Sequence, residues 1–139
     1  YPFDFVGIYN RQKFIDIGGF DYSIKSPYWQ LLDFGVRSWL WGEKIKITTA
    51  LQLSYSVEEA PVEDSTANLD SLRFYLKNEL PKYKLDHAVI KKSSFGRFYR
   101  HSGCGWFEAR RQFKDAMSWL EQNKYKFKID LQTLIENWN

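Results

Sequence analysis

The chain has 139 residues and a mass of 16.6 kDa, which suits one domain or part of one. Hydrophobic residues make up 44% of it, and no apolar run approaches the roughly 20 residues of a membrane-spanning helix. The net charge of +3 is mild, and the single cysteine, Cys104, excludes an internal disulfide bond.

Two compositional features leave alternatives open. Aromatic residues make up 19% of the chain, and such rings either fill a core or line pockets for sugars, nucleobases or apolar ligands. The one dense basic segment spans residues 87–100, with Arg110 and Arg111 further on. We expect a solvated surface there and no nucleic-acid partner. Peripheral contact with anionic lipid headgroups is the sharper alternative.

Cysteine and histidine usage bears on compartment and metal chemistry. A lone cysteine fits a reducing compartment, so we expect a cytoplasmic location, either free or at the cytoplasmic face of a membrane. No Cys/His array has the spacing of a zinc site. We therefore expect no metal site and no cofactor in this chain.

The first part of the chain alternates between strand and helix patterns. Residues 3–9 are short, aromatic and β-branched, which predicts a buried strand. Residues 11–17 predict one or two helical turns, ended by a Gly-Gly pair. Alternating polar and apolar residues predict two further strands, over 44–49 and 51–57.

The best-marked element is a helix that follows the Gly-Gly pair. Ser26 is a good N-cap, and Pro27 occupies the first helical position, where its missing N–H is not needed. The helix runs to about Trp41, and Gly42 follows as its C-terminal stop.

The remainder of the chain is predicted to be mainly helical. The acidic stretch 58–64 reads as a loop and a subdomain boundary. Leucines at helical spacing predict a helix over 66–80, whereas residues 81–104 are ambiguous and receive no assignment. A long helix is predicted over 105–123 and a short one over 130–138.

This order predicts an α/β protein, of the mixed α+β kind if the chain is a fragment. We divide it into an α/β part over residues 1–57 and a mainly helical C-terminal extension over residues 58–139.

One ordered set of motifs suggests a family. Residues 18–21 read Gly-Gly-Phe-Asp, and the helix that follows carries Asp33, Arg37 and Gly42 in turn. This pattern resembles a segment late in the catalytic domain of family-2-type glycosyltransferases with the GT-A fold. The resemblance covers roughly residues 3–57 and places the chain in the C-terminal, acceptor-side part of such a domain.

The resemblance implies an activity and its cofactors. Enzymes of this class move a sugar from a nucleotide-sugar donor to a hydroxyl group of a carbohydrate or lipid-linked acceptor, as in the synthesis of cell envelope polysaccharides. The nucleotide and a Mg²⁺ or Mn²⁺ ion bind in the N-terminal half of the domain, which would precede this chain. We therefore expect the isolated chain to be inactive.

The sequence departs from the family where the family places its general base. Inverting members open the acceptor-side helix with a Glu-Asp pair, and a positioned carboxylate there takes the acceptor's proton. Gln30 and Leu31 occupy those positions here. Asp33 remains as a candidate catalytic base, or it is a structural partner of Arg37 four residues on. Asp21 either contacts the acceptor or caps the Gly-Gly turn.

The acceptor would contact the loop 21–26 and one face of the helix. Tyr28 and Trp29 either stack on a sugar ring or pack in the core. The altered base position also keeps a second hypothesis open, a non-catalytic interaction module derived from a glycosyltransferase domain. The substrate-binding candidates are Asp21, Tyr28, Trp29, Gln30 and Arg37.

Overall fold

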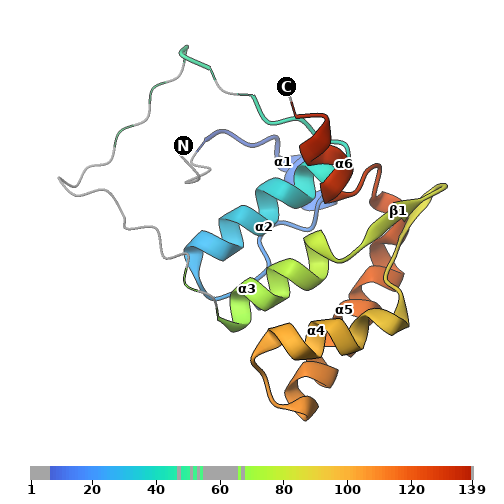
Figure 1. Ribbon diagram of the computed structural model, residues 1–139. Helices are drawn as coiled ribbons and strands as arrows, with labels where there is room; N and C mark the ends of the chain where they lie inside the picture. The colour runs from blue at the N-terminus through green and yellow to red at the C-terminus, as the bar shows by residue number, and fades with distance from the viewer. Residues whose placement is uncertain are drawn as a thin grey trace.

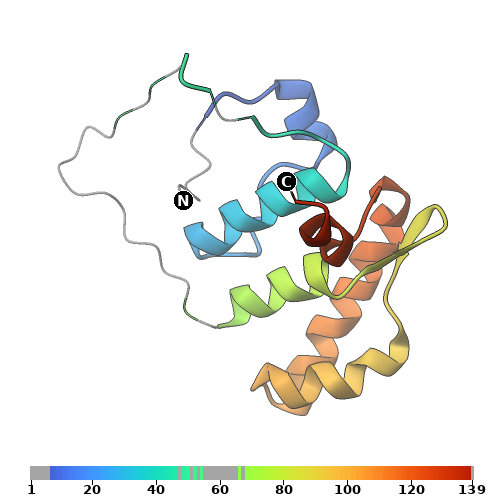
Figure 2. The same ribbon diagram turned by 45° about the horizontal axis from the view of Figure 1, so that its top comes forward.

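The computed structural model describes residues 7–46, 48–50, 52, 54, 66 and 68–138. They form a mainly helical unit with one β hairpin, in which α2 and α3 lie side by side and α5 crosses beyond them (Figures 1 and 2). The elements are α1 (Arg11–Asp16), α2 (Pro27–Leu40), α3 (Leu69–Phe74), η1 (Tyr75–Glu79), β1 (Lys82–Lys84), β2 (His87–Val89), η2 (Lys92–Ser94), α4 (Phe95–Ser102), α5 (Trp106–Asn123), η3 (Lys124–Lys126) and α6 (Leu131–Glu136).

The predicted helices before residue 42 are confirmed. Helix α1 begins after Asn10, whose side chain accepts a hydrogen bond from the Lys13 backbone N–H at 3.0 Å. Helix α2 begins at Pro27 as expected, but Ser26 makes no side-chain capping bond in the described structure. Its backbone N–H donates instead to the Asp70 carboxylate at 2.7 Å, so a residue distant in sequence fixes this helix start.

The predicted strand over 44–49 is wrong in its described part. Residues 44–46 and 48–49 are irregular, and so are residues 7–9 at the end of the first predicted strand. A strand must pair its backbone groups with a neighbour, and within the described ranges none pairs with these residues. Residues 3–6 and most of 51–57 lie outside the described residues, and so does the whole of the predicted loop over 58–64.

The ambiguous stretch after Pro81 contains a hairpin and a helix. Strands β1 and β2 pair antiparallel, with Tyr83 opposite Ala88, and Leu85 occupies the turn with φ of 57°. Helix α4 follows directly after η2. Strands of three residues are too short to show a period, which is why the sequence pattern gave no assignment.

The predicted helix over 66–80 begins later and ends differently. Asn68 caps it with bonds from the backbone of Asp70 and Ser71. From Tyr75 onward the helix widens to the π form, and the Leu80 N–H donates to the Tyr75 carbonyl at 2.9 Å. Residues 105–123 and 130–138 contain α5 and α6 as predicted, with Asp130 capping α6.

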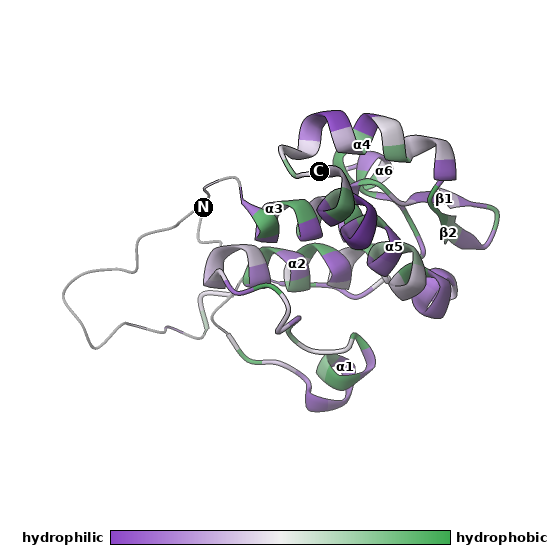
Figure 3. Ribbon diagram, turned by 90° about the horizontal axis from the view of Figure 1, so that it is seen from below, coloured by the Kyte–Doolittle hydropathy of each residue, from purple (hydrophilic) through white to green (hydrophobic). Residues whose placement is uncertain are grey.

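One core joins the two predicted parts of the chain. Leu40 of α2 is fully buried among Leu76, Phe98, Leu120 and Phe127 of the later elements. Figure 3 shows α2 beside α3, whereas α1 stands to one side. Helix α2 is therefore part of the same packed unit as the helices after residue 68.

Candidate functional site

The loop over residues 18–26 connects the Gly-Gly pair to α2, and Arg37 of α2 fixes its start. The Arg37 guanidinium donates to the carbonyl oxygen of Gly19 at 2.8 Å and to that of Ile17. Gly18 and Gly19 have φ of 91° and 62°, in the left-handed region that favours glycine. Both glycines are therefore needed to turn the chain under this guanidinium.

Gln30 fixes the middle of the loop. Its side-chain amide donates to the carbonyl oxygens of Asp21 and Ile24, each at 3.1 Å. Ile24 is completely buried. Because the amide is used within the chain, Gln30 acts here as a support of the loop.

Helix α3 holds the end of the loop. The Asp70 carboxylate accepts from the backbone N–H groups of Lys25 at 3.1 Å and Ser26 at 2.7 Å. Arg73, one turn later, donates to the Ser23 carbonyl oxygen. The loop backbone is therefore held from both sides, by α2 and by α3.

Asp33 lies at the buried centre of this arrangement. Its side chain has no exposed surface. One carboxylate oxygen accepts from Arg37 at 2.7 Å, and the other accepts from the Asn78 amide at 2.8 Å. A general base must reach the hydroxyl that it deprotonates, so this geometry favours the structural alternative, in which Asp33 orients Arg37.

Asp21 lies at the edge of the same network and is partly exposed. Its carboxylate pairs with the Lys77 ammonium and accepts from the Ser23 N–H at 2.9 Å. Burial raises the pKa of Asp21, but the Lys77 charge and the hydrogen bonds from Lys77 and Ser23 outweigh it and lower the pKa to about 2. Asp21 is thus ionised at neutral pH and is a weak base there.

A pocket of about 280 Å³ opens beside Asp21, and we call it the loop pocket. The Lys77 ammonium lies between Asp21 and Trp119. It pairs with the Asp21 carboxylate, and its Nζ is 4.5 Å from the centre of the Trp119 ring. The pocket combines carboxylate, cationic, amide and aromatic groups, which together suit a polar, hydroxyl-bearing ligand. Its polar and aromatic lining includes Asp21, Arg73, Lys77, Gln112, Asp115 and Trp119.

The other substrate-binding candidates lie away from the loop pocket. Trp29 donates from its indole N–H to the Thr66 carbonyl at 3.1 Å and packs on Phe74, with 5.5 Å between ring centres. Tyr28 contacts Trp29 edge to face. The structure therefore brings Asp21, Gln30 and Arg37 together at the loop, whereas Tyr28 and Trp29 lie outside the pocket lining.

Several residues of the site were not identified from the sequence. Residues 112, 115–116 and 119 follow the spacing of one helix face, a signal that could have shown the α5 wall of the pocket. Lys77 and Asn78 had no such signal, since they lie in the π-helical turn of η1, which shifts the register.

Metal-ligand and membrane-spanning features were sought across the same residues. No group of three or more His, Cys, Asp or Glu side chains in the described ranges could hold a metal ion. None of the helices that the structure describes is long and apolar enough to cross a bilayer. Comparison with family models, curated proteins and solved structures found no match.

Proposed function

We propose that this chain is the acceptor-side part of a glycosyltransferase and that the loop pocket binds the acceptor. The observation that carries the proposal is the position of Asp21. This last residue of the Gly-Gly-Phe-Asp motif lines the loop pocket, and the side chains of Gln30, Arg37 and Arg73 hold the backbone around it. A held loop keeps a ligand-binding carboxylate in one orientation, which favours binding without further ordering of the chain.

The groups in the pocket suit positioning of an acceptor. A carboxylate with a pKa of about 2 stays ionised and accepts hydrogen bonds from sugar hydroxyls. Arg73 also lines the pocket, where its guanidinium donates to the Ser23 carbonyl oxygen and, at 3.4 Å, to the Gln112 side-chain oxygen. Since Asp33 is buried and Asp21 is a weak base, we assign acceptor positioning and not proton transfer to these two carboxylates.

The rest of the reaction lies elsewhere under this proposal. The nucleotide-sugar donor and a Mg²⁺ or Mn²⁺ ion would bind to a preceding half of the domain, in the cytoplasm or at the cytoplasmic face of a membrane. The acceptor is a carbohydrate or a lipid-linked sugar. The chain as described here would not bind a nucleotide sugar tightly.

The test uses the natural protein that carries this chain, in a sugar-transfer assay. Asp21→Asn should lower kcat/KM for the acceptor by about tenfold, the effect of losing one charge-assisted hydrogen bond. The KM for the donor should not change. Asp16→Asn, an exposed aspartate on α1, is the matched control. Equal kcat/KM values for Asp21→Asn and wild type would overturn the acceptor assignment.

The alternative is a non-catalytic interaction module, and the use of Gln30 and Asp33 in holding the loop favours it. Titration of the natural protein with uridine and guanosine diphosphate sugars in the presence of Mn²⁺ separates the two functions. Saturable binding that the isolated chain lacks supports the transferase. A folded protein that binds none of these sugars supports the module.

A further inference from the structure

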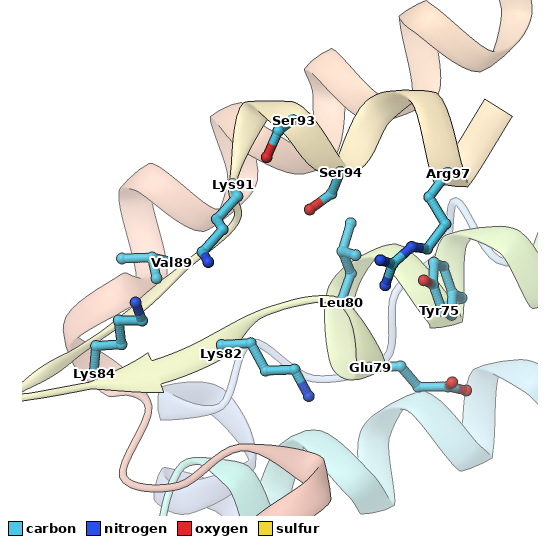
Figure 4. A pocket seen from close by; sticks show the side chains of 10 residues that line it. All are labelled: Tyr75, Glu79, Leu80, Lys82, Lys84, Val89, Lys91, Ser93, Ser94 and Arg97. Carbon is cyan, nitrogen blue, oxygen red and sulfur yellow. The ribbon is translucent and has the colours of Figure 1, made fainter.

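A second and larger cavity lies on the other side of η1, between the β1–β2 hairpin and the start of α4 (Figure 4). Its volume is about 520 Å³, within the range of small-molecule sites. Leu80 and Val89 supply apolar lining, and the Tyr75 ring is held by stacking on Phe98. We call this cavity the hairpin pocket.

The hairpin pocket is strongly cationic. Four positively charged side chains line it, against a single carboxylate, that of Glu79. Figure 4 shows them on two sides of the hollow: two lie on β1, one lies just before η2, and one lies in the first turn of α4. The four are Lys82, Lys84, Lys91 and Arg97.

None of the four cations forms a salt bridge within the described residues. Lys82 donates to the neutral Gln132 amide, and its charge helps to lower the pKa of Asp130. Glu79 forms no salt bridge with the described residues either, and desolvation raises its pKa above the ordinary value. Like charges that share a hollow raise the local positive potential and attract anions.

Two serine hydroxyl groups also line the pocket. Ser93 and Ser94 lie between Lys91 and Arg97 in the chain, and their hydroxyls point into the space above the hairpin in Figure 4. Arg97 offers a planar set of N–H donors beside the Tyr75 ring, and lysine offers a compact point charge. Hydroxyl, guanidinium and ammonium donors around one hollow match the several acceptor oxygens of a phosphate group.

We propose that the hairpin pocket binds the phosphate group of a phosphate-bearing ligand, with Lys91, Arg97 and the Ser93 and Ser94 hydroxyls as its contacts. The phosphate can belong to a soluble diphosphate or to the headgroup of an anionic lipid, and both present the same oxygens. This inference does not rest on the proposed transferase activity, since none of these residues lines the loop pocket.

The test measures binding of inorganic pyrophosphate to the full chain by isothermal titration calorimetry. Lys91→Ala and Arg97→Ala should each weaken binding by about tenfold, because each removes a charged donor. The matched controls are Lys92→Ala, the neighbour of Lys91, and Arg100→Ala, nearly one turn beyond Arg97. Both controls remove the same charge from exposed positions outside the lining, so their affinities should stay within about twofold of wild type.

A second experiment, vesicle sedimentation, identifies the source of the phosphate. Vesicles of phosphatidylcholine with and without phosphatidylglycerol are sedimented with wild-type and variant chains. Retention on anionic vesicles that Lys91→Ala abolishes and Lys92→Ala preserves identifies a lipid headgroup. Pyrophosphate binding without such retention identifies a soluble diphosphate. Ser93→Ala, which removes one proposed contact at an exposed position, repeats both arms should Lys91→Ala or Arg97→Ala fail to fold by circular dichroism, and it should also weaken binding.

Two results would overturn the proposal. One is the lack of saturable binding in both arms. The other is equal weakening by the pocket variants and by Lys92→Ala and Arg100→Ala, which would show attraction to the net surface charge rather than to the pocket.

Discussion

At the scale of single residues, Asp33 and Arg37 show how a motif can be used for support. The family resemblance pointed to Asp33 as a base, whereas in the structure its carboxylate accepts from Arg37 and Asn78 and lies 3.9 Å from the Lys77 ammonium. Removing one partner of a buried ion pair destabilises the fold, because the other charge stays buried without a counterion. Asp33 therefore stabilises the conformation of the loop, because it orients Arg37.

Replacing Asp33 with alanine should destabilise the protein strongly. The Arg37 guanidinium, whose side chain is only 4% exposed, would lose its counterion, a loss of about 3–5 kcal/mol in the free energy of unfolding. Urea denaturation followed by circular dichroism measures it. Asp16→Ala on the exposed face of α1 is the control and should change stability by less than about 0.5 kcal/mol. A small effect of Asp33→Ala would contradict the structural role.

Asp21 should make stability depend on pH in the acid range. Its folded pKa, about 2, lies below the ordinary value of 3.8, so the ion pair with Lys77 stabilises the fold above pH 4. That contribution, about 2 kcal/mol, is lost as the pH falls from about 4 to 2. Comparing the unfolding free energies of wild type and Asp21→Asn at pH 5 and pH 2.5 isolates the contribution of the Asp21 carboxylate. Parallel losses in the two proteins would contradict it.

At the scale of elements, the Gly-Gly turn depends on both conformation and space. A Cβ on Gly19 would lie 3.0 Å from the Phe14 ring at φ of 62°, whereas a Cβ on Gly103 would meet open space at φ of 67°. The two positions share the left-handed backbone conformation and differ in crowding.

Alanine substitution at these two glycines should separate strain from crowding. Gly103→Ala should lower the free energy of unfolding by about 1–2 kcal/mol, from the backbone alone. Gly19→Ala should lower it by about 1–3 kcal/mol more, from the contact with Phe14. Thermal or urea unfolding of the pair provides the measurement. Equal losses would show that the Phe14 ring moves aside freely.

Helices were predictable from the sequence where their own residues encode them. Pro27 marked the start of α2, Gly42 its end, and the periodic apolar residues of α5 its length. The strand over 44–49 was predicted from alternation alone, which takes no account of a partner strand. The π-helical turn and the hairpin depend on tertiary packing, so the spacing of residues 75–89 did not reveal them.

The same difference between local sequence signals and tertiary packing explains which residues of the site could be predicted. Asp21, Gln30 and Arg37 were identified because they belong to a motif within one short segment. Their partners Asp70, Arg73 and Lys77 lie on elements that only folding brings close. The role of Gln30 as a loop support could not be inferred, since its acceptors are backbone carbonyls and leave no trace in the sequence.

At the scale of the whole molecule, the predicted boundary near residue 57 crosses a shared core. A chain shortened to residues 1–64 would lose Asn78 from Asp33 and the later hydrophobic residues from Leu40. An isolated helix of 14 residues such as α2 is marginal in water. We therefore expect this shortened chain to show no cooperative unfolding transition by circular dichroism, in contrast to the full chain. A sigmoidal transition would establish the first part as an independent unit.

The bonds that hold the loop join residues far apart in the sequence, and this separation has a consequence for folding during translation. Lys77 follows Asp21 by 56 residues, and Arg73 follows Ser23 by 50. At about 5–20 residues per second, a ribosome would need on the order of seconds to deliver these partners after the loop itself. During that time the Gly-Gly segment is exposed to chaperones and proteases without its final conformation. A segment that is translated early thus acquires its shape late, when α3 docks against α2.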